Sequence, residues 1–293
     1  MISDIRLNEL IRTALDEDIG SGDLTTSTVL TGDEPGVAQT ISKGETIVAG
    51  IDVFREVFHV LDSSLSFEAY FRDGHPAWKG DVLACISGRL KSILLAERVA
   101  LNLFQRMCGI ATMTHKYVEE VKGSGVRILD TRKTTPGLRS LEKYAVKTGG
   151  GFNHRFGLYD GVMIKDNHIT AAGGISRAVR KVVGNVPPTV KIEVEVKNLQ
   201  EVEEALAAGA DIIMLDNMGT GEMKKAVSLI DGRALVEASG NVTLSNVKKT
   251  AETGVDFISV GALTHSAPAA DISLVFRDQG LAQQKPGNYG SKV

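Results

Sequence analysis

The apolar positions divide the chain into two parts of different texture. Residues 5–18 carry apolar side chains at helical spacing, and residues 90–118 form a longer apolar pattern with one charged face, interrupted near Gly109. Between these helices, glycines punctuate short stretches that resemble strands, at residues 37–49, 66–72 and 82–87. The first hundred residues therefore predict an α+β lobe.

From residue 126 onward, the apolar runs become short, rich in β-branched residues and regularly spaced. There are six, at residues 126–129, 161–164, 190–196, 211–215, 234–238 and 257–260. Helical patterns separate them, at residues 140–148, 175–183, 199–209, 221–230 and 245–254. Alternating strands and helices predict a parallel sheet, which right-handed crossovers either close into a barrel or leave open and doubly wound.

Five of the six runs end in a charged or hydroxyl side chain, and the sixth is followed by a glycine. The residues at these ends are Arg132 and Lys133, Lys165, Glu195, Asp216, Ser239 and Gly261. In a barrel of strands and helices, the carboxyl ends of all strands point to one face, where the active site is built. The pattern therefore predicts a site at that face.

The third run places charge where a barrel is usually apolar. A strand period of two puts Lys191, Glu193 and Glu195 on one face of this strand. Barrel interiors are filled by branched aliphatic side chains, so charges that point inward need cationic partners or water. Lys165 on the preceding strand is one candidate partner. An edge strand with one solvated face would explain the same pattern.

Overall composition and charge exclude several classes of protein. The net charge of −3 gives no reason to expect a nucleic-acid or membrane-surface protein, and no apolar run is long enough to span a bilayer. The N-terminus has no apolar segment of the signal-peptide kind, and two well-separated cysteines, Cys85 and Cys108, suggest buried thiols in a reducing cytosol.

Residues 132–165 carry seven Lys or Arg and two Asp or Glu, a net of 7 − 2 = +5. We expect Lys143 and Lys147 to face solvent on a helix. The remaining cations predict a site for an anion with more than one negative group, because Arg grips carboxylates and phosphates with two donors. Small residues after the last strands, at 238–241 and 260–266, predict a phosphate cradle of backbone N–H groups.

Several long strings of this chain resemble the quinolinate phosphoribosyltransferase (carboxylating nicotinate-nucleotide pyrophosphorylase) family of type II phosphoribosyltransferases. They are DTRKTTPGLR, KYAVKTGGGFNHRFGLYDGVMIKDNHI, IEVEV, IMLDN and VGALTHS, with EDIGSGDLTT and AERVALNLFQRMCGIAT nearer the N-terminus. The resemblance runs from about residue 5 to 275. It implies an α/β fold in which an N-terminal α+β lobe, residues 1–108 joined by 268–293, accompanies an incomplete, open α/β barrel of about six parallel strands, residues 109–267.

The resemblance also implies a reaction. The family transfers the phosphoribosyl group of 5-phosphoribosyl 1-pyrophosphate (PRPP) to quinolinate with decarboxylation, giving nicotinate mononucleotide, pyrophosphate and CO₂ for NAD synthesis. Mg²⁺ accompanies PRPP, and no organic cofactor is expected. We expect a cytoplasmic homodimer with small-molecule substrates and no nucleic-acid or membrane partner.

Matching motifs imply roles for individual residues. Arg132, His154, Arg155 and Lys165 would hold the two carboxylates of quinolinate, while Arg98 would enter the site of a neighbouring subunit. Lys133, Glu195 and Asp216 would be catalytic, with Lys133 near the pyrophosphate and the two carboxylates on ribose hydroxyls or Mg²⁺. The other expected substrate contacts are Thr131, Ser239, Gly240, Asn241, Val260, Gly261 and Ala262. Asn241 stands where many members have glycine.

Two alternatives remain open from the sequence. A Schiff-base aldolase would use Lys165 at its strand end as a nucleophile. A non-catalytic paralogue would keep the fold for binding alone. The polar tail after residue 277 has no recognisable family pattern, and we expect it to be mobile.

Overall fold

The computed structural model describes residues 4–277, and packing divides the chain into two compact units. The first unit contains the chain up to residue 112, residues 140–149 and the segment from residue 267 onward. The second contains residues 113–139 and 150–266. Each unit therefore collects segments that are far apart in the sequence. The tail that the sequence predicts to be mobile lies, after residue 277, outside the described residues.

The first unit is built on an antiparallel sheet with the strand order β12-β1-β5-β3. Its strands are β1 (Pro35–Ser42), β2 (Thr46–Ile47), β3 (Ser66–Ala69), β4 (Pro76–Ala77), β5 (Val82–Arg89) and β12 (Ile272–Phe276), with β2 and β4 forming a separate pair. Its helices are α1 (Asp4–Ile19), α2 (Leu24–Val29), α3 (Ile51–Leu61), most of α4 (Leu90–Glu120) and nearly all of α5 (Arg139–Thr148). The boundary between the units falls within α4 after residue 112 and within α5 before residue 140. In the core, Phe54 of α3 stacks on Phe104 of α4 with ring centroids 4.8 Å apart.

Helix α4 is continuous, so the predicted interruption near Gly109 is wrong. Glycine disfavours a helix interior because it loses more backbone entropy than other residues. Here the glycine makes room for a neighbouring segment, because a Cβ atom at this position would lie 2.0 Å from the carbonyl oxygen of Pro268. The close approach of residue 268 explains the glycine, and no break is needed.

The second unit contains a six-stranded parallel sheet in the order β6-β11-β10-β9-β8-β7. The strands are β6 (Arg127–Leu129), β7 (Val162–Ile164), β8 (Ile192–Val196), β9 (Ile212–Asp216), β10 (Leu235–Ser239) and β11 (Phe257–Ser259). Among the strands described, β6 and β7 form the two edges, so the barrel is open between them. This confirms the predicted open α/β barrel with an N-terminal α+β lobe, and every predicted strand lies within a few residues of an observed one.

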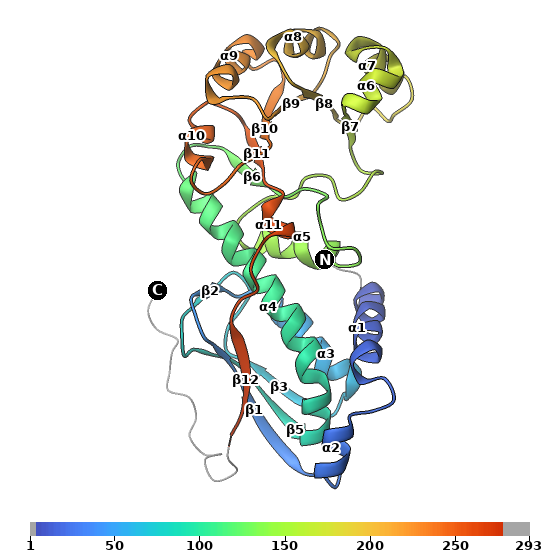
Figure 1. The fold of residues 1–293 in the computed structure, drawn as a ribbon, viewed down its shortest axis with the longest axis vertical. Helices are drawn as coiled ribbons and strands as arrows, with labels where there is room; N and C mark the ends of the chain where they lie inside the picture. The colour runs from blue at the N-terminus through green and yellow to red at the C-terminus, as the bar shows by residue number, and fades with distance from the viewer. Residues whose placement is uncertain (1–3, 278–293) are drawn as a thin grey trace. The chain divides into compact units, whose positions relative to one another are not determined.

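Helices follow the strands of the second unit and cover the outside of its sheet, as Figure 1 shows for α7, α8 and α9. The helices of this unit are α6 (Asp166–Ala172), α7 (Ile175–Val183), α8 (Leu199–Ala207), α9 (Thr220–Ile230), α10 (Val247–Ala251) and α11 (Ala262–His265). Parallel strands covered in this way are apolar on their outer side, and Val194, Ile213 and Leu215 are fully buried. The inner side is therefore free to carry other chemistry.

Some local predictions fail. Lys143 is buried rather than solvent-facing, since only 1% of it is exposed. The predicted strand at 37–49 is two strands, β1 and β2, separated by residues 43–45. No helix in the described part of the chain is both long and apolar enough to cross a bilayer.

Candidate active site

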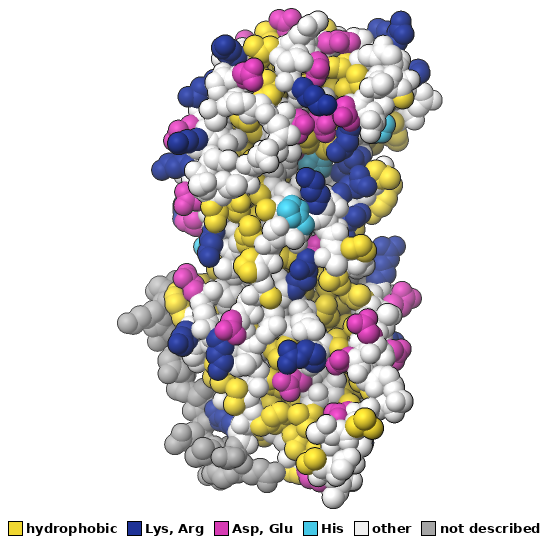
Figure 2. Space-filling view, viewed as in Figure 1, with side chains coloured by type: hydrophobic (Ala, Val, Ile, Leu, Met, Phe, Trp, Pro, Cys, Tyr) yellow, Lys and Arg dark blue, Asp and Glu magenta, His cyan; other side chains and the backbone are white. Residues whose placement is uncertain are grey.

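A cavity of about 360 Å³ lies at the carboxyl ends of the parallel strands. The predicted residues that line it are Thr131, Arg132, Lys133, His154, Arg155, Lys165, Glu195, Asp216 and Ser239. Four further residues line it that were not among the predicted site residues: Met163, Met214, Glu237 and Ser259. The structure thus brings most of the predicted site together in one place. Around it the charge is mixed, and Figure 2 shows Lys and Arg side chains beside Asp and Glu on the second unit.

A buried carboxylate ties together the two loops that carry the cations. Asp130, at the end of β6, is fully buried and accepts hydrogen bonds from the backbone N–H of His154 (2.9 Å) and from Nδ2 of Asn153 (2.6 Å). Charge-assisted bonds of this kind are strong and directional. Asp130 therefore fixes the loop of His154 and Arg155 against the strand that leads to Arg132.

Arg139 does not belong to the anion site, although it contributes to the positive charge of its segment. Its Nε donates to Oγ1 of Thr134 at 2.9 Å, and its Nη1 donates to the carbonyl of Phe156 at 3.2 Å. The guanidinium thus braces two loops through polar groups of the chain. The cations that remain for a ligand are those lining the cavity.

Two arginines that line the cavity, Arg132 and Arg155, have features that favour an anionic ligand. Nε of Arg132 is buried and has no hydrogen-bond partner among the described residues. Burial and the positive charge of Arg132 lower the pKa of Arg155, whose Nη1 donates to the carbonyl of Gly161 at 3.0 Å. Like charges held close together and a buried donor without a partner both favour an anionic ligand.

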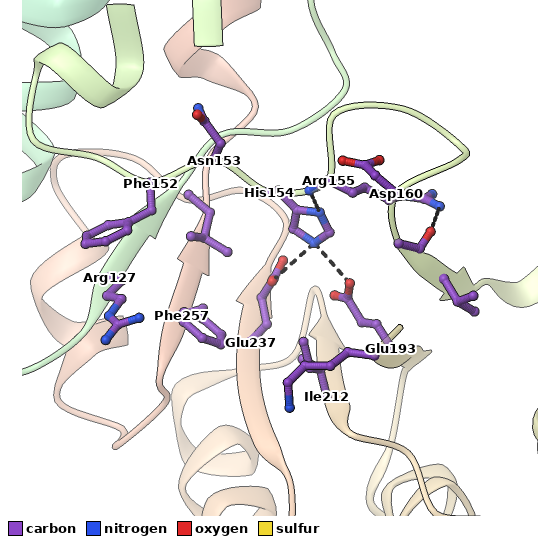
Figure 3. A pocket seen from close by; sticks show the side chains of 14 residues that line it. Arg127, Phe152, Asn153, His154, Arg155, Asp160, Glu193, Ile212, Glu237 and Phe257 are labelled. Carbon is purple, nitrogen blue, oxygen red and sulfur yellow. Dashed lines mark hydrogen bonds and ion pairs between the residues drawn. The ribbon is translucent and has the colours of Figure 1, made fainter. Parts of the chain in front are cut away.

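His154 is held by two glutamates of the barrel interior. Its Nε2 lies 3.0 Å from Oε2 of Glu193 and 3.5 Å from Oε2 of Glu237, and Figure 3 shows the ring between them. Burial lowers the pKa of His154, but the hydrogen bonds to the two carboxylates outweigh it and raise that pKa above its ordinary value. The backbone N–H of Arg155 donates to Nδ1 at 2.7 Å and opposes a second ring proton there.

Glu195 and Asp216 end the neighbouring strands β8 and β9 on the other side of the cavity. Nζ of Lys165 lies 3.6 Å from Oε2 of Glu195, so the predicted pairing of these two residues is confirmed. Burial raises the pKa of Glu195, Lys165 opposes this shift, and the nearby negative charge of Asp216 adds to it. Two half-buried carboxylates that repel each other favour a cation, and a hard divalent ion with one or two carboxylates and substrate phosphates fits this donor set.

The loop after β10, where the sequence predicts a phosphate cradle, has two consecutive residues with positive φ. Gly240 has a φ of +94°, and a Cβ there would lie 2.2 Å from Oδ1 of Asn217. Asn241 has a φ of 51°, a left-handed conformation that asparagine tolerates better than most residues. An asparagine can therefore adopt the backbone conformation of this position. Ser259 donates to Ser239 through their hydroxyl groups at 3.0 Å and joins the ends of β11 and β10.

The short helix α11 packs against the loop of Lys133. Oγ1 of Thr264 donates to the carbonyl of Lys133 at 2.8 Å, and a Cβ at Gly261 would lie 3.0 Å from Cδ of Lys133. Gly261 caps the helix and Ala262 begins it, directly after Val260. The exposed Lys133 is therefore placed next to the predicted cradle, although Gly240, Asn241, Val260, Gly261 and Ala262 do not themselves line the cavity.

Comparison with known families decides the identity of this arrangement. The C-terminal domain model of quinolinate phosphoribosyl transferase matches residues 110–275, and the N-terminal domain model matches residues 23–108. The chain belongs to the quinolinate phosphoribosyl transferase family. The "probable nicotinate-nucleotide pyrophosphorylase [carboxylating]" of Bacillus subtilis is 45% identical over 270 residues, covering 92% of this chain and 93% of that protein.

Solved structures of the quinolinate phosphoribosyl transferase family share the fold. NadC from Streptococcus pyogenes is 40% identical with a TM-score of 0.90, covering 95% of this chain and 99% of that one. The nicotinate-nucleotide pyrophosphorylase from Francisella tularensis is 41% identical with a TM-score of 0.90, covering 94% and 98% of the two chains.

Six of the fifteen predicted site residues do not line the cavity: the five residues of the predicted phosphate cradle named above, and Arg98. Arg98 lies on α4 in the first unit, its side chain is exposed, and it does not line the cavity. Conversely, Glu237 lines the cavity, although no motif singled it out before the fold was known. The available signal was its position within a predicted barrel strand. A carboxylate inside such a strand is unusual, as it is for Glu193 and Glu195 in the third strand.

Proposed function

We propose that this chain catalyses the transfer of a phosphoribosyl group from PRPP to quinolinate with loss of CO₂, as a carboxylating nicotinate-nucleotide pyrophosphorylase (EC class pentosyltransferase). Family membership over both domains supports this reaction. The structural observation that carries it is the cavity itself, where Arg132, Arg155 and Lys165 line the same space as Glu195 and Asp216. This divided charge suits a dianionic acceptor beside a sugar phosphate.

The cations account for recognition of the pyridine diacid. The buried Nε of Arg132 lacks a partner, and Arg155 lies close enough to share its positive potential. A dicarboxylate satisfies both groups, while a monocarboxylate leaves one donor set unpaired, which is costly in a half-buried site. Thr131 and His154 line the same cavity and complete this part of the proposed binding site.

The carboxylates account for the transfer step. As the bond between C1′ and pyrophosphate breaks, positive charge develops on the ribose, and Glu195 and Asp216 stabilise it electrostatically. Lys133 and the backbone of residues 239–241 and 260–262 hold the phosphate groups. Glu195 and Asp216 would hold Mg²⁺ together with PRPP, and the ion would supply positive charge that neutralises the leaving pyrophosphate.

Decarboxylation then needs little chemistry from the protein. The ring nitrogen becomes cationic when it bonds to C1′, and its positive charge stabilises the electron pair that the departing CO₂ leaves at C2. That carbon takes up one proton, so the products are nicotinate mononucleotide, pyrophosphate and CO₂. The side chains mainly hold the two substrates in position, and no organic cofactor enters the proposal.

The proposal includes a homodimer in a reducing cytoplasm. Arg98 belongs to the first unit, is exposed and does not line the cavity of the second unit, so we propose that it serves the site of a second subunit. Cys85 and Cys108 are free thiols, which suits a reducing compartment. Small molecules are the only partners that the proposed reaction requires besides the second subunit.

Release of labelled CO₂ from quinolinate in the presence of PRPP and Mg²⁺ tests the function. We expect CO₂ and nicotinate mononucleotide in equal amounts, and no mononucleotide from nicotinate used as the control acceptor. Trapping of a carbonyl substrate on Lys165 by borohydride would instead indicate an aldolase. Binding of quinolinate without turnover would indicate a non-catalytic paralogue.

A further inference from the structure

We propose that Glu237, with Glu193, is a positioning residue that holds the ring of His154 at the floor of the catalytic cavity and thereby sets the affinity for quinolinate. The inference rests on the proposed function, because it assigns a role in binding one of the two proposed substrates. Glu237 lies on β10 and Glu193 on β8, with β9 between them. The two carboxylates thus reach the same ring from different strands (Figure 3).

The contacts around His154 fix its position from several sides. Its backbone N–H donates to Asp130, and its Nδ1 accepts from the N–H of Arg155. Its Nε2 is directed at Glu193 and Glu237. Because both ring nitrogens have partners, the ring has one orientation. The backbone of Arg155 is tied to that orientation, since its N–H donates to Nδ1 of the ring.

Stability alone does not account for the two glutamates. Both are almost completely buried, at 3% exposure for Glu193 and 1% for Glu237, and Oε1 of each has no hydrogen-bond partner among the described residues. Burial of a carboxylate is costly, and well-packed aliphatic side chains in place of buried charges are often at least as stable. Barrel interiors are normally filled with such side chains. A role in placing His154 explains why charged residues stand here.

Glu193 and Glu237 act as a clamp on the ring of His154, and a second cavity beside the catalytic one shows which movement of the ring this clamp would prevent. It has a volume of about 330 Å³, and Phe152, Ile212 and Phe257 form part of its apolar wall (Figure 3). His154, Arg155 and Glu237 line both this cavity and the catalytic one. The imidazole therefore stands in the partition between two open spaces, and without its carboxylate partners it has room to turn away from the catalytic side.

The first test compares Glu237→Gln with wild type. Glutamine keeps the shape of the side chain and removes its charge. Because a charge-assisted hydrogen bond to His154 is then lost, we expect the KM for quinolinate to rise about tenfold and the KM for PRPP to stay unchanged. Glu222→Gln on α9, outside both cavities, is the matched control and should leave both KM values unchanged. An equal rise in both KM values, or no rise for quinolinate, would overturn the proposal.

A double-mutant cycle separates positioning from general structure. In a His154→Ala background, Glu237→Gln should add no further rise in the KM for quinolinate, because the carboxylate acts through the ring. Additive losses would contradict the inference. If Glu237→Gln does not fold, Glu237→Asp, which keeps the charge but shortens its reach, is judged by the same two criteria.

An observation without substrate keeps this inference apart from the proposed function. The ring nitrogen signals of His154 in ¹⁵N-histidine-labelled protein, assigned by their loss in His154→Ala, should shift in Glu237→Gln and stay in place in Glu222→Gln. Unchanged signals would refute the clamp even if the enzyme is active. A wild-type protein that does not release CO₂ would refute the function and leave the clamp to this measurement.

Discussion

At the scale of single residues, Arg155 offers a direct test of the anion site. Arg155→Ala removes charge-assisted hydrogen bonds to the proposed substrate carboxylate that are worth about 2 kcal/mol, so we expect a roughly 30-fold loss in kcat/KM. The loss should appear with quinolinate as the varied substrate. Arg177→Ala on α7, outside the cavity, is the control. Wild-type kinetics in Arg155→Ala would remove this residue from the site.

Gly240 tests the proposed phosphate cradle. Alanine at this position must adopt a φ of +94° and would place its Cβ 2.2 Å from Oδ1 of Asn217, so the loop has to move. We expect Gly240→Ala to raise the KM for PRPP severalfold and to lower the free energy of unfolding by about 1–2 kcal/mol. Gly232 also has a positive φ but has open space around it, so Gly232→Ala should lower the free energy of unfolding and leave the KM for PRPP unchanged. A PRPP affinity that matches wild type in Gly240→Ala would argue against the cradle.

The sequence could predict residues whose role follows from their place at a strand end. Arg132, Lys165, Glu195 and Asp216 all line the cavity. It could not predict Glu237 as a lining residue, because which inward carboxylate meets which loop depends on the strand order and on the path of residues 150–161. Arg139 counted as charge in the sequence, but in three dimensions it serves the backbone of its own loops.

At the scale of elements, two helical glycines make opposite predictions. Gly109→Ala should destabilise the protein by about 1–3 kcal/mol, because its Cβ would meet the carbonyl of Pro268. Gly221→Ala, near the start of α9 with nothing within 4 Å, should stabilise it by up to about 1 kcal/mol. Thermal unfolding of the two variants checks both signs. A stabilised Gly109→Ala would show that helix propensity, rather than the contact, decides.

Element types followed from periodicity where the pattern was long or repeated. The six strands and five of the helices that follow them were predictable because each repeat has the same alternation of apolar run and amphipathic segment, whereas α6 was not predicted. The break in α4 was wrongly predicted, because the reason for Gly109 lies in residue 268, far away in the sequence. Strand β12 escaped notice for the same reason, since its pairing with β1 is a long-range contact.

At the scale of the whole molecule, the proposed homodimer has a specific consequence for activity. Arg98→Ala and Lys165→Ala should each be nearly inactive alone, because each removes a cation from every site. Mixed dimers of the two variants should recover up to about half of the activity per dimer, since one of the two sites then carries both cations. Activity after mixing, refolding and purification of the heterodimer tests this, with each refolded single variant as control. No recovery would argue against a site shared between subunits.

The first unit is assembled from pieces at both ends of the chain, and this determines when it can form during synthesis. Strand β12 is translated after the whole second unit, so the edge of β1 that it covers has no partner on the ribosome until the last strand emerges. Domains usually fold in the order in which they leave the ribosome, and exposed strand edges invite aggregation. The whole second unit is therefore synthesised before β12, the last strand of the described residues, can complete the N-terminal sheet.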